Sequence, residues 1–213
     1  MKLTLYYSPI SCSLVPYIAP TEAKAEFEVR VIDFKRGGHL KEEYLRINPK
    51  HKVPVLEIDG EPLTENVAIQ LWIARHFPHA NLLPDGHDEF RAISLMAWCA
   101  SGIHPFLTPN VLPQRYCDLP GSEDSVRRCA QKVYLENIQI AEQLLTNRQW
   151  FFEQFSLPDI YFFWCFRRGT QFKIDMSAFH QCQAHFERVS QRASVRKLLA
   201  FEAATMLELN RAD

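Results

Sequence analysis

The first 78 residues alternate between the two-residue apolar period of strands and the longer period of helices. Strand-like runs cover residues 2–7, 27–34, 53–58 and 61–65, and helical spacing covers residues 11–25, 39–49 and 65–78. The first strand, helix and strand form a βαβ unit, whose two strands should be parallel. Asp59-Gly60 separates the last two runs and is a strong hairpin signal. The pattern therefore predicts a mixed sheet of four strands with helices on both faces.

The strand pattern disappears after about residue 80, where Pro84 and Gly86 lie in a linker-like stretch. Helical spacing then covers residues 88–104, 122–146, 156–168, 177–191 and 194–209. We therefore expect an α/β domain over residues 1–79, a linker over 80–87 and an all-helical domain over 88–213.

Three local patterns predict how individual helices begin or end. Pro20 lies where the first helix should continue, so a kink or an early stop is expected there. Ser122, followed by acidic residues, is a candidate N-cap. Ser156 and Asp159 match a capping box, and the flanking Phe155 and Ile160 match a hydrophobic staple. The capping box is interpreted as a folding device rather than a functional site.

Composition limits the classes of partner. The chain has 213 residues, 47% apolar and 23% charged, with a formal net charge of −1. This charge argues against nucleic acid or an anionic membrane surface as the main partner, because both require a basic face. No signal peptide and no membrane-spanning run are expected, so the predicted location is a reducing cytoplasm with six free cysteines. The cysteines lack metal-ligand spacing, so no metal site is expected.

Cys12 follows the first predicted strand and lies just inside the first predicted helix. Unpaired backbone N–H groups and the helix dipole favour a thiolate there, which would lower the thiol pKa. Ser11 and Ser13 flank the cysteine and offer hydroxyl groups to its sulfur. The alternative is a buried, inert cysteine, and position alone does not decide between the two.

Two further positions suggest a ligand site. If the Val53-Pro54 bond is cis, the backbone of Val53 can pair with an extended peptide-like ligand; a trans proline opening an edge strand is the alternative. At the start of the third helix, Asn66 is a candidate N-cap whose neighbouring amides suit a carboxylate, and Glu65 suits an ammonium group. Ordinary helix capping is the alternative for this second position.

These pieces, in this order, resemble the soluble glutathione transferases over nearly the whole chain. The segments that carry the resemblance are MKLTLYYSPISCSLVPYIA, INPKHKVPVL, LTENVAIQLWIARHFP and the late capping box. YYSPISCS is similar to the tyrosine, proline and cysteine segment of the bacterial Beta class. The resemblance implies a thioredoxin-like N-terminal domain, an all-α C-terminal domain and glutathione as co-substrate.

The same resemblance implies roles for single residues. Cys12 would contact the glutathione sulfur, with Tyr7 and Ser11 as further catalytic candidates. The residues implied to bind glutathione are Cys12, Lys52, Val53, Pro54, Glu65, Asn66 and His104. Three positions depart from the family: Asn66 replaces a usual serine, Pro20 interrupts the first helix, and Pro105 follows His104 where the Beta class often has a basic residue. His104 is equally well explained as a core or helix-end histidine.

Three functions are compatible with this resemblance. The first is conjugation of glutathione to a small hydrophobic electrophile, and the second is glutathione-dependent disulfide reduction through Cys12. The third is a non-catalytic scaffold that keeps the fold, an alternative suggested by Asn66. The family also implies a homodimer.

Overall fold

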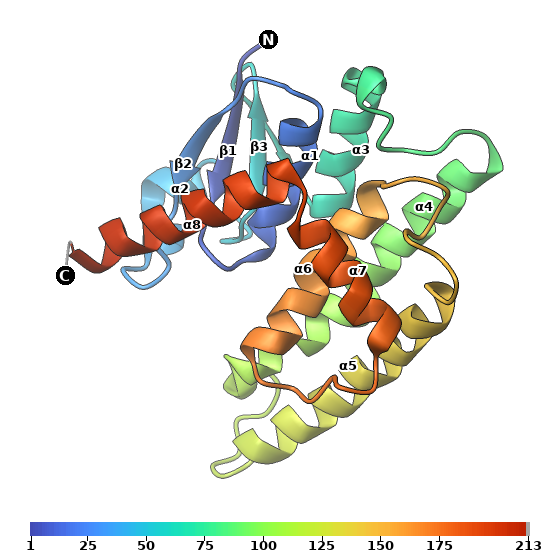
Figure 1. Cartoon of the computed structure of the whole chain (residues 1–213). Coiled ribbons are helices and arrows are strands. Elements are labelled where there is room, and N and C mark those ends of the chain that lie inside the picture. The colour runs from blue at the N-terminus through green and yellow to red at the C-terminus, as the bar shows by residue number, and fades with distance from the viewer. Residues whose placement is uncertain (212–213) are drawn as a thin grey trace. The chain divides into compact units, whose positions relative to one another are not determined.

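The computed structural model describes residues 1–211, and the contacts within it divide the chain into two compact units (Figure 1). Residues 1–83, together with the segment that begins at Gln191, form unit 1, and Pro84–Ser190 form unit 2. The sequence pattern had assigned the last helix to a helical domain over 88–213. The structure groups that helix with the sheet of unit 1 instead, because its side chains pack against the first strand and helix.

The sheet of unit 1 has the strand order β2-β1-β3-β4. Its strands are β1 (Leu3–Tyr7), β2 (Glu28–Val31), β3 (Val55–Ile58) and β4 (Glu61–Thr64). β1 is parallel to β2 and antiparallel to β3, and β3 is antiparallel to β4. The predicted βαβ unit, hairpin and mixed four-stranded sheet are confirmed.

Helices cover both faces of this sheet, as predicted. The helices of unit 1 are α1 (Val15–Glu22), α2 (Glu42–Leu45), α3 (Asn66–His76) and α8 (Ala193–Arg211). On one face, Tyr6 packs with Tyr44 of α2. On the other, Tyr7 packs against Tyr17 of α1 and Phe201 of α8. α1 passes through Pro20 and ends at Glu22, three residues before the predicted end at residue 25.

The beginning of α8 is fastened to the end of α1 by an ion pair. Arg192 donates from Nε and Nη2 to the two carboxylate oxygens of Glu22, at 2.8 and 2.7 Å. The Ser194 hydroxyl donates to the same carboxylate. Burial acts to raise the pKa of Glu22, but the hydrogen bonds from Arg192 and Ser194 and the charge of Arg192 outweigh it, so this pKa is lowered from its ordinary value of 4.5.

Replacing Glu22 by glutamine should therefore reduce the stability of the chain at neutral pH. It should also make the free energy of unfolding less dependent on pH in the acidic range. A carboxyl whose pKa is depressed by folding stabilises the fold above its unfolded pKa, and this contribution is lost as pH falls through the lower folded value. Urea unfolding at pH 7 should show a loss on the order of 1 kcal/mol, because the pair is partly exposed. The difference from the unmodified chain should shrink below pH 4.5. If the stability difference between the variant and the unmodified chain stays constant down to pH 3, the lowered pKa of Glu22 would be contradicted.

Unit 2 is helical throughout, as predicted for residues between the linker and the last helix. Its long helices are α4 (His87–Trp98), α5 (Glu123–Leu144), α6 (Leu157–Gln171) and α7 (His180–Ser190). A π-helical turn, Cys99–Ile103, continues α4. Ser122 occupies the N-cap position of α5, as predicted, but it has helical backbone angles and its side chain makes no capping hydrogen bond.

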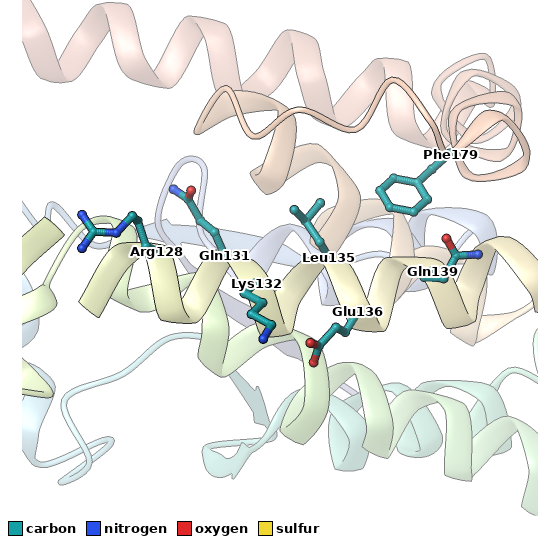
Figure 2. Close-up of a pocket in the computed structure, with 7 residues that line it drawn as sticks. All are labelled: Arg128, Gln131, Lys132, Leu135, Glu136, Gln139 and Phe179. Carbon is teal, nitrogen blue, oxygen red and sulfur yellow. The ribbon is translucent and has the colours of Figure 1, made fainter. Parts of the chain in front are cut away.

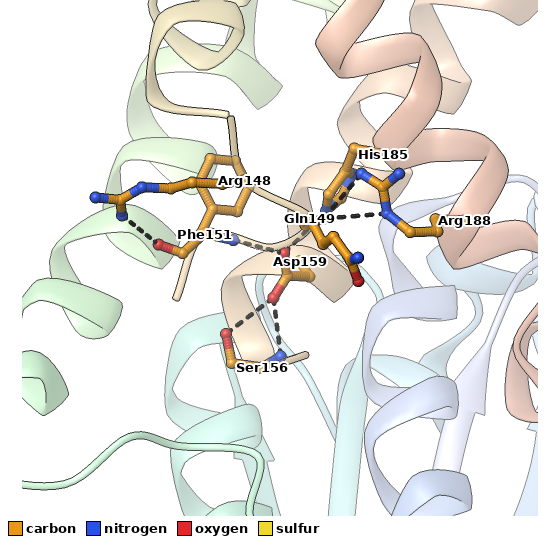
Figure 3. Close-up of polar contacts among 7 residues, drawn as sticks. All are labelled: Arg148, Gln149, Phe151, Ser156, Asp159, His185 and Arg188. Carbon is orange, nitrogen blue, oxygen red and sulfur yellow. Dashed lines mark hydrogen bonds and ion pairs between the residues drawn. The ribbon is translucent and has the colours of Figure 1, made fainter. Parts of the chain in front are cut away.

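The predicted capping box at the start of α6 is confirmed, and it is the centre of a larger buried network (Figure 3). Asp159 is fully buried and accepts hydrogen bonds from the backbone N–H and hydroxyl of Ser156 at 2.8 and 2.9 Å. Its other oxygen accepts from the Phe151 N–H at 3.1 Å and contacts His185 Nε2 at 2.9 Å. Asp159 thus joins the loop before α6 to α7.

Among residues 1–211, no helix is both long enough and apolar enough to cross a lipid bilayer.

Candidate functional site

A serine-rich turn carries Cys12 from the end of β1 into a short 3-10 helix over Cys12–Leu14. Ser11 is its N-cap, and the Ser11 Oγ accepts from the Ser13 N–H at 3.2 Å. The Ser11 and Ser13 hydroxyls also contact each other, and both lie within hydrogen-bond distance of the Ser8 carbonyl, at 2.7 and 3.1 Å. The expected hydroxyl donation to the sulfur of Cys12 is therefore not observed, because these groups fix the turn.

Three segments of unit 1 meet at Cys12. Its Sγ donates to the carbonyl of Val53 at 3.5 Å, next to a Val53-Pro54 bond that is cis, as the resemblance implied. Its own carbonyl accepts from Nδ2 of Asn66 at 3.2 Å, at the first residue of α3. The 3-10 helix, the proline turn and the start of α3 therefore converge around one half-buried thiol.

The protonation of Cys12 differs from the prediction. Burial raises the pKa of the Cys12 thiol from its ordinary value of 9.0 to about 12, with a smaller contribution in the same direction from the Glu65 carboxylate. Hydrogen bonding at the start of the helix, the Asn66 side chain and the charge of Lys52 act in the opposite direction, but they are outweighed. The helix start was predicted to lower this pKa, and that prediction was wrong because loss of hydration is the larger effect. Cys12 is a neutral S–H donor at pH 7.

The turn that contains Val53 is held by two side chains from the preceding segment. The Tyr44 hydroxyl and Nδ2 of Asn48 both donate to the carbonyl of Lys52, at 2.6 and 2.7 Å. The Lys52 side chain itself is exposed, so its charge stays in contact with solvent while it acts on Cys12. These bonds fix the backbone on which a peptide-like ligand was predicted to pair.

At the start of α3, the N-cap residue differs from the predicted one. Glu65, not Asn66, occupies the N-cap position, with a left-handed φ of 72° and no side-chain cap, so the N-cap prediction for Asn66 was wrong. The Glu65 carboxylate pairs with Lys50 Nζ at 2.6 Å. Asn66 is 6% exposed, and its Oδ1 has no hydrogen-bond partner among residues 1–211. A buried acceptor beside free helix amides suits a ligand that brings its own donor.

Two of the predicted residues lie elsewhere. Tyr7 is fully buried, and its hydroxyl donates to Oε2 of Glu202 at 3.2 Å. The Tyr7 hydroxyl is held by this carboxylate, and its catalytic role stays a prediction. His104 belongs to unit 2, where its Nδ1 lies 3.2 Å from the Tyr161 hydroxyl and its ring packs against Trp164 at 4.3 Å. Its contact with glutathione stays a prediction.

Sequence patterns did not identify Tyr44, Asn48 or Glu202. Asn48 lies in the quoted segment INPKHKVPVL, so its proximity to the proline turn had a local signal. Glu202 had none, because it comes 190 residues after Cys12 and only the packing of α8 brings it near β1.

An open groove of about 510 Å³ follows α5 in unit 2 (Figure 2). Its lining residues are Arg128, Gln131, Lys132, Leu135, Glu136, Gln139 and Phe179. The charges on this face are of both signs, and the groove contains none of the predicted site residues. Among residues 1–211, no three His, Cys, Asp or Glu side chains are grouped as metal ligands.

Comparison with known sequences finds a family match in the sheet-containing part of unit 1. Residues 1–75 match the model of the glutathione S-transferase N-terminal domain. Over 206 residues, the chain is 28% identical to "Glutathione S-transferase GstA" of Escherichia coli O157:H7, covering 94% of this chain and 98% of that protein. It is 25% identical over 213 residues to "Disulfide-bond oxidoreductase YfcG" of Escherichia coli K12, covering 92% and 94%.

Solved structures extend the likeness over both units. A Beta class glutathione S-transferase of Sphingomonas chungbukensis is 33% identical, with a TM-score of 0.83 and coverage of 93% of this chain and 98% of that one. A sphingomonad glutathione S-transferase in complex with glutathione is 31% identical, with a TM-score of 0.84 and coverage of 94% and 98%.

Proposed function

Since the chain belongs to the soluble glutathione transferase family, we propose that it binds glutathione at the convergence around Cys12 and conjugates its thiolate to a small hydrophobic electrophile. The observation that carries the proposal is the convergence at Cys12, whose thiol donates to the Val53 carbonyl and whose own carbonyl accepts from Asn66. Glutathione is the co-substrate, as it is the ligand bound in the sphingomonad structure.

The backbone of Val53 pairs with the cysteinyl part of glutathione in this proposal. The amino-acid end of the tripeptide lies at Glu65 and Asn66, where the carboxylate attracts the ammonium group and the first amides of α3 take the carboxylate. Lys52 pairs with the glycyl carboxylate. Each of these groups lies in unit 1, and the segments that carry them are joined by the hydrogen bonds described above.

Cys12 acts as a hydrogen-bond donor in this proposal. Its S–H turns from the Val53 carbonyl to the glutathione sulfur and stabilises the thiolate, which is the reactive form. The thiolate then attacks the electrophilic carbon: a C–S bond forms, and the electron pair of the breaking bond leaves with the leaving group or moves into the substrate. The proton released from the glutathione thiol passes to solvent. The class of electrophile follows from the family alone.

A second function, disulfide reduction through Cys12, is favoured by the likeness to the disulfide-bond oxidoreductase. In that reaction the Cys12 thiolate attacks a disulfide sulfur and forms a mixed disulfide, which a second thiolate then resolves. The step requires a Cys12 thiolate, and burial of the thiol opposes its formation. Conjugation is therefore the favoured reaction. The third alternative, a non-catalytic scaffold, predicts no glutathione binding.

Calorimetric titration with reduced glutathione tests the proposal. Binding in the micromolar to millimolar range is expected for the unmodified chain, about 4 to 8 kcal/mol in free energy. Replacing Lys52 by alanine should weaken binding about threefold to fivefold, because an exposed ion pair contributes 1 kcal/mol or less. Lys41→Ala is the matched control, since Lys41 is also an exposed lysine, precedes α2 and is not among the residues assigned to the site. The absence of any heat of binding would reject the enzyme functions and leave the scaffold.

The homodimer implied by the family remains part of the proposal. Size-exclusion chromatography with light scattering should give twice the mass of the 24.8 kDa chain. A single monomeric peak would remove this claim without affecting the glutathione site.

A further inference from the structure

The turn that presents Cys12 contains a residue in an unfavourable conformation. Ile10 has a φ of 67°, in the left-handed region. A β-branched residue adopts this conformation only where its surroundings enforce it. The turn therefore needs an anchor outside its own sequence.

Glu202 of α8 provides this anchor. Its Oε2 accepts the backbone N–H of Ile10 at 2.7 Å. The same oxygen accepts the Tyr7 hydroxyl at 3.2 Å. Glu202 is 3% exposed, so it is a buried carboxyl aimed at the end of β1 and the turn that follows.

The anchor is connected to Cys12 through the turn itself. The Ile10 amide is fixed by Glu202, and the next residue, Ser11, caps the 3-10 helix whose first residue is Cys12. On the other side of Ile10, the Ser8 N–H donates to Oγ of Ser13, which lies within that helix. Fixing the middle of the turn therefore sets where the Cys12 sulfur lies relative to Val53.

α8 has an independent attachment to the rest of unit 1. The Arg192–Glu22 pair fastens its beginning to the end of α1, away from the turn. The buried carboxyl of Glu202 is thus a separate polar contact, and it reaches a backbone amide of the segment that carries the thiol.

We propose that Glu202 is a positioning residue for Cys12: through the Ile10 amide, it holds the turn so that the thiol meets the Val53 carbonyl and the Cys12 carbonyl meets Asn66. The proposal rests on the proposed function in one respect, namely that Cys12 faces glutathione. The position of the thiol can be tested without any ligand.

The experiment measures alkylation of the Cys12 peptide by iodoacetamide, resolved by mass spectrometry, together with glutathione affinity by calorimetry. In Glu202→Ala the Ile10 amide loses its acceptor, so Cys12 should become more accessible and be alkylated severalfold faster. Glutathione should bind about tenfold more weakly, the equivalent of one hydrogen bond to a charged group. In Glu202→Gln the side-chain amide oxygen still accepts from the Ile10 N–H. The Cys12 alkylation rate and the glutathione affinity should therefore stay within about twofold of the unmodified chain. Exposed Cys129 in unit 2 is the internal reference for alkylation.

Glu22→Gln is the matched control, since it weakens another attachment of α8, at the beginning of the helix, and leaves the turn intact. If Glu202 merely holds the helix in place, this variant should change Cys12 alkylation as Glu202→Ala does, and that result would overturn the proposal. Unchanged alkylation in folded Glu202→Ala would overturn it as well. If Glu202→Ala does not fold, Glu202→Asp keeps the charge but draws the carboxylate back from Ile10, and the same increase is expected. If the unmodified chain binds no glutathione, the proposed function fails, while the alkylation result still decides the role of Glu202.

Discussion

Asp159→Ala is expected to destabilise the chain by about 3–5 kcal/mol, the usual result of removing one partner from a buried charged network. The carboxylate accepts from Ser156, Phe151 and His185, and every one of these contacts lies out of reach of solvent (Figure 3). Truncation leaves their donors unpaired in the interior, and each unpaired group carries its own desolvation cost. Because whole domains are stable by only about 5–15 kcal/mol, this loss is a large fraction of the total.

Urea unfolding followed by tryptophan fluorescence is the measurement for this variant. Trp98, Trp150 and Trp164 all lie in unit 2, so the signal reports mainly on the unit that contains Asp159. Ser156→Ala is the matched control: it removes one hydroxyl from the same network and should cost only about 1 kcal/mol. If the two variants were equally stable, the carboxylate would not be the centre of the network.

The capping box illustrates what the sequence can predict. Ser156 and Asp159 are three positions apart, so the spacing alone was enough to predict the first turn of α6. The hairpin at Asp59-Gly60 was predictable for the same reason, because it depends on residues close together in the chain. The parallel pair β1–β2 joins residues 24 positions apart, and it was predicted from the rule for βαβ connections instead. His185 could not be predicted as a partner of Asp159, because 26 residues and a turn of unknown direction separate them.

The candidate site shows the same limit. Its three segments were identified from local motifs, and the cis bond at Val53-Pro54 agreed with the family resemblance. The protonation of Cys12 was predicted in the wrong direction because helix-end electrostatics can be read from sequence, whereas the loss of hydration depends on packing. The role of Glu202 depends on α8 folding back onto β1, which no pattern near Cys12 reveals.

A neutral Cys12 changes which reaction the site favours. A thiolate at this position would be a nucleophile toward disulfides, whereas a thiol can donate a hydrogen bond to the sulfur of a bound ligand. The pKa of about 12 applies to the chain without glutathione. The two reactions can therefore be separated by asking whether the site needs the nucleophilicity of sulfur or only a donor hydrogen.

Cys12→Ala should lower the conjugation rate constant by about 10- to 100-fold, since a hydrogen bond to a charged group contributes about 1.5–3 kcal/mol. The KM for glutathione should change little, because the remaining contacts to the tripeptide lie on Val53, Glu65 and Asn66. Without the donor, the bound glutathione thiol ionises less readily. The midpoint of the pH–rate profile should therefore move upward by about one to two pH units. Steady-state kinetics with a chromogenic electrophile between pH 6 and 9 measures both effects.

Cys12→Ser distinguishes the two functions, because a hydroxyl can donate a hydrogen bond but cannot form a mixed disulfide. If Cys12 acts as a donor, the serine variant should conjugate at a rate near that of the unmodified chain, with its pH midpoint within about half a pH unit. Glutathione-dependent reduction of a small disulfide should fall to the uncatalysed rate in both the serine and alanine variants. A serine variant as impaired in conjugation as the alanine variant would show that the sulfur itself reacts, and disulfide exchange would then become the favoured function despite the buried thiol.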